Sequence, residues 1–150
     1  MLDSKTKTAL LRELPKIYEM NFGRLLHLLP NIHELHGSFT VLLDEVTHLT
    51  LDIIEQYQYT TILSLTQQPG RRSTWIPELH MKIRIYHDAR CAEVIGYQQS
   101  SRFRASYPYP NRDMYQQLEK RQINLFFHDW LQHCLALRRR HRLTLSTSNA

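Results

Sequence analysis

The sequence predicts an α+β fold, in which an antiparallel sheet of about five to six strands packs against a C-terminal helix and an N-terminal helical arm. Two observations carry this prediction. Apolar residues recur at helical spacing near both ends of the chain, in residues 16–29 and 118–137. Between these segments, apolar and polar residues alternate with a period of two, as in half-buried strands. The short connections favour antiparallel pairing, because parallel neighbours require crossover helices.

The first helical segment is residues 16–29, KIYEMNFGRLLHLL. Its apolar residues follow one face of a helix, with Pro15 suited to the first turn and Pro30 ending the run. Ser4 is placed to cap a shorter helix before it. The two pieces form the predicted N-terminal arm.

The alternating segments begin at Ser38. They predict strands in residues 38–44, 49–54, 59–67, 79–86 and 91–98, with a sixth strand in residues 101–107. Residues 67–78 contain two prolines and a glycine and predict a loop.

The clearest helix is the segment at residues 118–137, whose apolar stripe includes Phe126, Phe127 and Trp130. A stripe with such large side chains suits packing against a sheet. We therefore expect a single domain over residues 1–137 and a basic, mobile tail over residues 138–150.

The length and composition limit the classes of protein to which the chain can belong. A chain of 150 residues fits one domain, and its hydrophobic fraction of 42% argues against a disordered or fibrous chain. The sequence shows no signal peptide and no apolar run long enough for a bilayer. Cys91 and Cys134 match no zinc or redox spacing, so we interpret both as small buried side chains. A cytoplasmic protein that makes no contact with a membrane is the expectation.

The positive charge is concentrated at the C-terminal end of the chain. Residues 1–100 carry ten Lys and Arg against eleven Asp and Glu, whereas residues 101–150 carry nine against three, so the two parts sum to −1 and +6. Arg102 and Arg104, with Tyr109 nearby, could bind phosphates and stack on bases. Nucleic-acid binding through Arg102, Arg104 and the arginines of residues 138–142 is therefore one hypothesis.

The segment RIYHDARCAEVI places His87 next to Asp88, with Glu93 further along. Neighbouring residues of a strand point to opposite faces, so His87 and Asp88 can form a pair only at a turn. One interpretation makes Asp88 a turn residue whose carboxylate accepts backbone N–H groups, and His87 a half-exposed strand end. The alternative is a small enzyme that uses His87, Asp88 and Glu93.

The sequence contains no motif typical of a metal site, a phosphate-binding loop or a serine nucleophile. The nine histidines show no HExxH or similar metal spacing, and the four glycines form no phosphate-binding loop. No serine lies in a nucleophile elbow. We expect neither a metal nor another cofactor.

Four segments read together identify a family: EMNFGRLLHLLP, RIYHDARCAEV, YPYPN and EKRQINLFFHDWL. Their order and wording resemble the YqiB-like family of bacterial proteins of unknown function, from about Tyr18 to Leu135. The resemblance implies a small bacterial cytoplasmic protein with no assigned reaction, cofactor or partner. It directs attention to the residues that make up the motifs, which are Glu19, Asn21, Tyr86, His87, Asp88, Glu93, Tyr109, Pro110, Asn111, Glu119, Lys120, Gln122, Asn124 and Trp130.

Together these observations favour a non-catalytic ligand-binding or adaptor domain, with a protein or a small anionic molecule as partner. Its binding surface is expected on an open sheet face or groove. The candidate ligand-binding residues are Arg84, Tyr86, His87, Asp88, Glu93, Arg102, Arg104 and Tyr109. The enzyme is the second hypothesis and nucleic-acid binding the third. Convergence of His87, Asp88 and Glu93 in one pocket would favour the enzyme.

Overall fold

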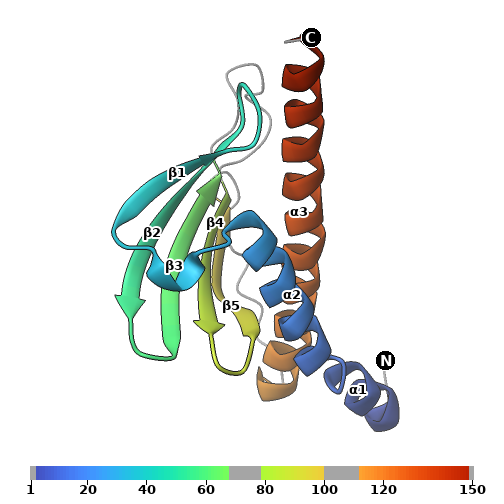
Figure 1. The fold of residues 1–150 in the computed structure, drawn as a ribbon. Helices are drawn as coiled ribbons and strands as arrows, with labels where there is room; N and C mark the ends of the chain where they lie inside the picture. Colours follow the sequence, from blue (N-terminus) through green and yellow to red (C-terminus); the bar gives the residue numbers. More distant parts are fainter. Residues whose placement is uncertain (1–2, 68–78, 100–111, 149–150) are drawn as a thin grey trace.

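The computed structural model describes residues 3–67, 79–99 and 112–148. Its elements, in chain order, are α1 (Ser4–Leu11), α2 (Leu14–Leu28), the short 3₁₀ helix η1 (Ile32–Glu34), β1 (Ser38–Leu42), β2 (His48–Gln56), β3 (Thr60–Gln67), β4 (Leu79–Tyr86), β5 (Cys91–Gln99) and α3 (Arg112–Ser148). Figure 1 shows the strands side by side, with α2 and α3 next to β5 and α1 projecting away from the sheet.

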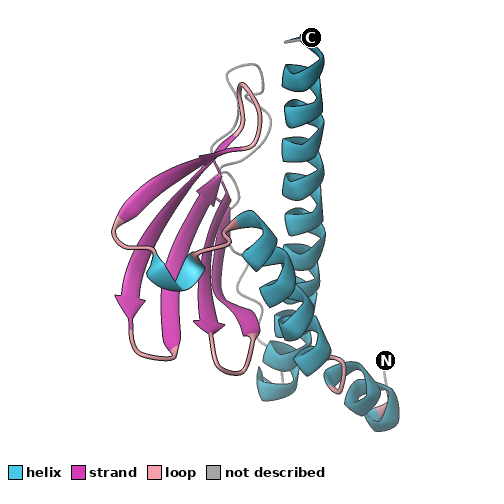
Figure 2. Ribbon diagram, in the orientation of Figure 1, coloured by secondary structure: helices cyan, strands magenta, loops and turns pink. Residues whose placement is uncertain are grey.

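The five described strands form one antiparallel sheet in the order β1-β2-β3-β4-β5. Each strand therefore pairs with the strand that follows it in the sequence, as Figure 2 shows. The predicted α+β class with an antiparallel sheet, an N-terminal helical arm and a C-terminal helix is confirmed. The sixth predicted strand, at residues 101–107, lies outside the described residues.

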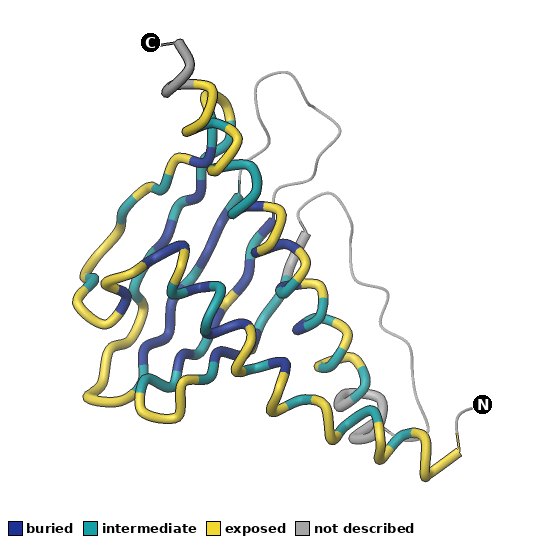
Figure 3. The backbone as a smooth tube through the Cα atoms, turned by 45° about the vertical axis from the view of Figure 1, so that its right-hand side comes forward, coloured by how far each residue is buried: buried dark blue, intermediate teal, exposed yellow. Residues whose placement is uncertain are grey.

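The two faces of the sheet differ because side chains alternate along each strand. In β4, Leu79, Met81, Ile83 and Ile85 are buried, whereas the residues between them are at least partly exposed. The buried face packs against α2 and α3 through the core residues Phe22, Leu25, Phe127, Trp130 and Leu131. We call this the helix face and the opposite one the outer face. Figure 3 shows the buried positions lying together on the strands and on α2.

Helix α2 begins at Leu14 and ends at Leu28, close to the predicted segment 16–29, and Pro15 lies in its first turn. Ile17, Phe22 and Leu25 form its buried face. Before it, α1 is capped by Asp3, whose carboxylate accepts the Thr6 N–H at 2.7 Å. Ser4, the cap expected from the sequence, is instead the first residue of α1.

Helix α3 is longer than the periodic segment that predicted it. It spans 37 residues from Arg112 to Ser148, so helical structure continues through most of residues 138–150. Phe127 and Trp130 are buried as expected, and their rings stack with centroids 6.1 Å apart. Phe126 is 40% exposed, and its ring makes a T-shaped contact with the ring of Tyr97, whose centroid lies 5.8 Å away. No helix in the described part of the chain combines the length and apolar character needed to cross a membrane.

The two cysteines have different surroundings. Cys134 is buried, and its burial raises the pKa of the thiol to about 12. Cys91 is only partly buried, so the prediction that both cysteines are buried is wrong for Cys91. Cys91 pairs with Tyr86 at the start of the edge strand β5, where its side chain points to the outer face.

Candidate functional site

The most highly connected polar group of the described residues surrounds the carboxylate of Glu93. Tyr86 donates its hydroxyl to Glu93 Oε1 at 2.9 Å, and Lys120 Nζ lies 2.9 Å from Oε2. Arg84 Nη1 lies 3.8 Å from Oε1, and Lys120 Nζ also lies 5.8 Å from the ring centroid of Tyr18. We call Tyr18, Arg84, Tyr86, Glu93 and Lys120 the edge cluster, because they meet where β5 borders the helices.

Strand register explains why three of these residues meet. Arg84 is paired with Glu93 across β4 and β5, so their side chains lie on the same face of the sheet. Tyr86 is two residues from Arg84 and shares that face. Tyr18 from α2 and Lys120 from α3 then reach this group from the helices. Four separate elements thus contribute to one cluster.

The electrostatics of the edge cluster follow from these contacts. The pKa of Lys120 is raised, chiefly by its hydrogen bond to Glu93. The pKa of Arg84 is raised, chiefly by its hydrogen bond to Tyr86. Burial raises the pKa of Tyr18, partly offset by Lys120. Both basic side chains therefore stay charged around a single buried carboxylate.

The two cations remain accessible although Glu93 is buried. The side chain of Arg84 is 38% exposed and that of Lys120 is 43% exposed, against 9% for Glu93. Both oxygens of Glu93 are already engaged, so this carboxylate is poorly placed to accept a proton from a substrate. The arrangement is better suited to binding an anion than to acid–base catalysis.

Two asparagines hold α2 and α3 next to the edge cluster. Asn124 Oδ1 accepts the buried backbone N–H of Val94 at 2.9 Å, which gives a partner to a donor on the edge strand. Asn21 Nδ2 donates to the backbone oxygen of Asn124 at 3.1 Å. Lys120 lies one helical turn before Asn124, and Asn124 Nδ2 donates to its backbone oxygen. These contacts fix the part of α3 that presents Lys120 to Glu93.

His87 lies on the opposite face of the sheet from the edge cluster. Its Nε2 is 2.7 Å from the hydroxyl of Thr61, a buried residue whose strand partner Ile85 is in the core. The ring of His33 from η1 meets the His87 ring edge-on at 6.2 Å. Burial lowers the pKa of His87, and His33 lowers it further while Asp88 opposes them.

Asp88 lies in the turn between β4 and β5, as its sequence context predicted. Its carboxylate accepts no hydrogen bond within the described residues, so the expected bond to a backbone N–H is not formed there. Asp44 makes that kind of turn instead, because its Oδ1 accepts the N–H groups of Val46 and Thr47 at 2.9 and 2.6 Å. In the turn after Asp88, Arg90 adopts a φ of 55° and places its guanidinium over the ring of Phe22.

The structure therefore separates His87 from Glu93, two of the three residues proposed for an enzyme. Glu93 bonds to Tyr86 and Lys120, whereas His87 bonds to Thr61 on the helix face. Asp88 follows His87 in the turn and lies near enough to influence its pKa, so the separation concerns His87 and Glu93. His87 and Glu93 therefore do not meet in one pocket.

The other candidate residues have different outcomes. Arg84, Tyr86 and Glu93 come together as described. Arg102, Arg104 and Tyr109 lie outside the described residues. Among the described residues, no group of three or more His, Cys, Asp or Glu side chains is arranged to hold a metal ion.

Sequence reasoning did not include Tyr18 and Lys120 among the candidate binding residues. Lys120 belongs to the segment EKRQINLFFHDWL, which supplied a motif but no chemical role. Tyr18 lies more than one hundred positions before Lys120, and no spacing rule connects them. The signal available was the presence of Lys120 in one of the segments that make up the family resemblance, whereas Tyr18 directly precedes the first of these segments.

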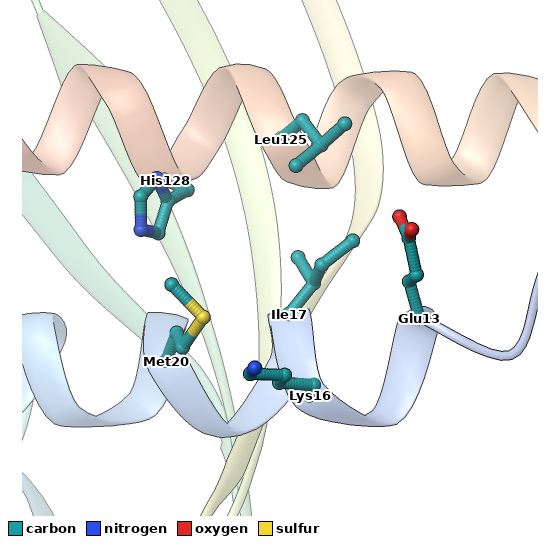
Figure 4. A pocket seen from close by; sticks show the side chains of 6 residues that line it. All are labelled: Glu13, Lys16, Ile17, Met20, Leu125 and His128. Carbon is teal, nitrogen blue, oxygen red and sulfur yellow. The ribbon is translucent and has the colours of Figure 1, made fainter. Parts of the chain in front are cut away.

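A separate groove lies between α2 and α3 and has a volume of about 240 Å³. Figure 4 shows its lining, in which the apolar side chains of Ile17, Met20 and Leu125 lie beside Glu13, Lys16 and His128. Glu13 at its rim is engaged by Arg121 Nη2 at 2.6 Å. The groove shares no residue with the edge cluster and is a second surface feature of the helix pair.

Comparison with known proteins places the chain in a family. Residues 24–140 match the family described as "Protein of unknown function (DUF1249)". The chain is also 41% identical over 125 residues to the uncharacterized protein YqiB of Escherichia coli strain K12, which covers 83% of this chain and 87% of that protein. YqiB of Escherichia coli O157:H7 matches to the same extent. No solved structure matches significantly.

The chain belongs to this family of proteins of unknown function, and the resemblance inferred from the four sequence segments is confirmed. Neither the family nor these relatives carry an assigned activity.

Proposed function

We propose that this protein is a non-catalytic binding protein that recognises a small anionic ligand at the edge cluster. The observation that carries the proposal is the pair of partly exposed cations, Arg84 and Lys120, held on either side of Glu93. Two cations facing one carboxylate leave a net positive charge at this point. An oxyanion such as a phosphate or a carboxylate complements that charge.

The supporting residues favour recognition of an oxyanion. The tyrosine hydroxyls provide further hydrogen-bonding groups beside the cations. Glu93 fixes Lys120 and Tyr86 before a ligand arrives, which lowers the entropic cost of binding. Glu55 contributes negative charge near Arg84 and keeps this charge while its carboxylate accepts the hydroxyl of Tyr57 at 3.3 Å, so Lys120 is the less compensated of the two cations.

A cytoplasmic location is part of the same proposal. Cys91 and Cys134 are both free thiols, as is usual for proteins in a reducing compartment. An adaptor role remains compatible, because acidic side chains of a partner protein offer the same carboxylate chemistry to Arg84 and Lys120.

The test is a titration of the isotopically labelled protein with inorganic phosphate, followed by NMR at constant ionic strength. We expect saturable shifts at Tyr86, Glu93 and Lys120. Lys120→Gln and Arg84→Gln should each weaken the binding by about tenfold, the loss of one charge-assisted contact. Lys5→Gln on the exposed surface of α1 removes the same charge and should leave the affinity unchanged. Shifts scattered over the surface, or an equal effect of Lys5→Gln, would contradict an anion site at the edge cluster.

A further inference from the structure

The second strongly charged feature of the described chain is an arginine-rich stretch of α3. It consists of Arg138, Arg139, Arg140 and Arg142, and we call it the arginine segment. The sequence contains no Asp or Glu after Asp129. Positive charge in this part of the helix is therefore not balanced by acidic residues along the same helix.

Arg138 has a structural role that separates it from the other three arginines. Its Nη1 and Nη2 donate to the backbone oxygens of Leu28 and His27 at 3.1 and 2.9 Å, at the C-terminal end of α2. Burial lowers the pKa of Arg138, and the nearby Arg142 lowers it further. Arg138 thus anchors the arginine segment to the core, while Arg142 adds a repulsive like charge one turn away.

Arg139, Arg140 and Arg142 are exposed and form no ion pair with any acidic side chain in the described parts of the chain. The helix dipole does not account for them, because its stabilisation of cations is confined to the last turn of a helix. Helix α3 continues to Ser148, and its last turn contains no basic residue. These three charges therefore have no evident role within the fold.

The neighbouring loop forms no ion pair with the arginine segment within the described residues. The loop between β1 and β2 lies near the same end of α3, as Figure 1 shows, and His141 is close enough to influence the pKa of Asp44. Burial raises that pKa, but the Val46 and Thr47 N–H groups and His141 together hold it below its ordinary value. The Asp44 carboxylate is thus occupied by its own turn.

We propose that Arg139, Arg140 and Arg142 form a nucleic-acid-binding surface that contacts the phosphate backbone without reading the sequence. Exposed, unpaired arginines held on a rigid helix are the usual means of neutralising phosphates. An anionic membrane is a poorer partner, because surface helices insert a broad apolar face and the apolar stripe of α3 is buried in the core. This surface is distinct from the edge cluster and does not depend on the function proposed for it.

The experiment measures binding of a short, fluorescently labelled DNA duplex by anisotropy across a series of salt concentrations. Arg139, Arg140 and Arg142 are replaced together by glutamine, which preserves helix propensity. We expect the triple variant to bind at least tenfold more weakly. Its slope of log K against log salt should be shallower by about 2 to 3, since each phosphate contact contributes about 0.9.

The matched control replaces Lys5, Arg12 and Lys16 by glutamine, which removes the same charge from exposed positions on the N-terminal arm. The control should retain nearly the wild-type affinity and slope. Circular dichroism and a thermal melt establish that both variants are folded. Equal losses in the two triple variants would overturn the proposal, because net charge alone would then explain binding. Binding to phosphatidylserine vesicles without binding to DNA would also overturn it, in favour of a lipid surface.

Discussion

At the scale of single residues, Glu93 shows how burial and pairing combine in this fold. A buried carboxylate is costly unless its oxygens are hydrogen-bonded, and here a tyrosine hydroxyl and an ammonium group satisfy both oxygens. Two of its partners are more than one third exposed, so solvent screens part of the interaction. Glu93 therefore contributes moderately to stability and strongly to the arrangement of its partners.

Glu93→Gln should lower the free energy of unfolding by about 1 to 2 kcal/mol, because the neutral amide loses the charge-assisted bond to Lys120. Urea unfolding monitored by fluorescence measures this change. Glu34→Gln, at a side chain that is 69% exposed, should change stability by less than about 0.5 kcal/mol. Equal effects of the two substitutions would show that the Glu93 contacts do not contribute to stability.

The lowered pKa of His87 predicts that the free energy of unfolding depends on pH. Its pKa in the folded protein is lowered below 6.5, chiefly by burial, so the unfolded chain binds the proton first as the pH falls. The contribution is fully present above 6.5 and is lost as the pH falls from 6.5 to the lower pKa of the folded state. His87→Gln should flatten this part of the stability profile, measured by urea unfolding across the window.

The control for this pH dependence is His27→Gln, because the His27 side chain is exposed. This variant should keep the slope of the wild-type profile. If His87→Gln keeps the full slope as well, the titration of His87 is not linked to folding.

At the scale of the elements, local sequence patterns predicted the strands of the sheet. The features that these patterns missed depend on contacts between residues far apart in the sequence. The period of two located all five described strands, since each strand has one face in the core. The periodic apolar stripe also located α3, but it predicted only the part of the helix that packs against the sheet. Apolar periodicity ends where packing against the sheet ends, although the helix itself continues to Ser148.

The candidate site shows the same limit. Register and alternation place Arg84, Tyr86 and Glu93 together because these residues lie on adjacent strands. The contribution of Lys120 depends on how α3 docks against β5, and Tyr18 depends in turn on how α2 packs against α3. No local pattern encodes these contacts, so sequence reasoning recovered the strand half of the edge cluster and not the helix half.

The docking of α3 yields a prediction at this scale. Trp130 is buried, stacks with Phe127 and donates its indole N–H to Gln67 Oε1 at 2.7 Å. Trp130→Ala should lower the free energy of unfolding by about 3 to 5 kcal/mol, through the cavity left and the lost hydrogen bond. Phe126→Ala, on the more exposed side of the same helix, should cost clearly less. A denaturant series that ranks the two variants equally would place Trp130 outside the cooperative core.

At the scale of the whole molecule, the fold closes by joining the two ends of the chain. The sheet is built entirely from sequential neighbours, whereas the contacts of α2 with α3 span more than one hundred positions. Arg121 binds Glu13, Asn21 binds the backbone of Asn124, and Arg138 binds the end of α2. The contacts between α2 and α3 therefore need nearly all of the chain to be present. One of these contacts is made by Arg138, at the position where the sequence predicts that a mobile tail begins.

This placement of Arg138 makes the boundary between domain and tail testable by truncation. A chain that ends at residue 143 keeps both Arg138 bonds to α2 and should match the full chain within about 0.5 kcal/mol. A chain that ends at residue 137 loses these bonds and leaves Cys134 in a fraying last turn, so it should be less stable by about 1 to 3 kcal/mol. Arg138→Gln in the full chain separates the two causes, because it removes the bonds without shortening the helix. If the chain ending at residue 137 unfolds at the same urea concentration as the full chain, the domain ends at 137 and the Arg138 contacts are dispensable.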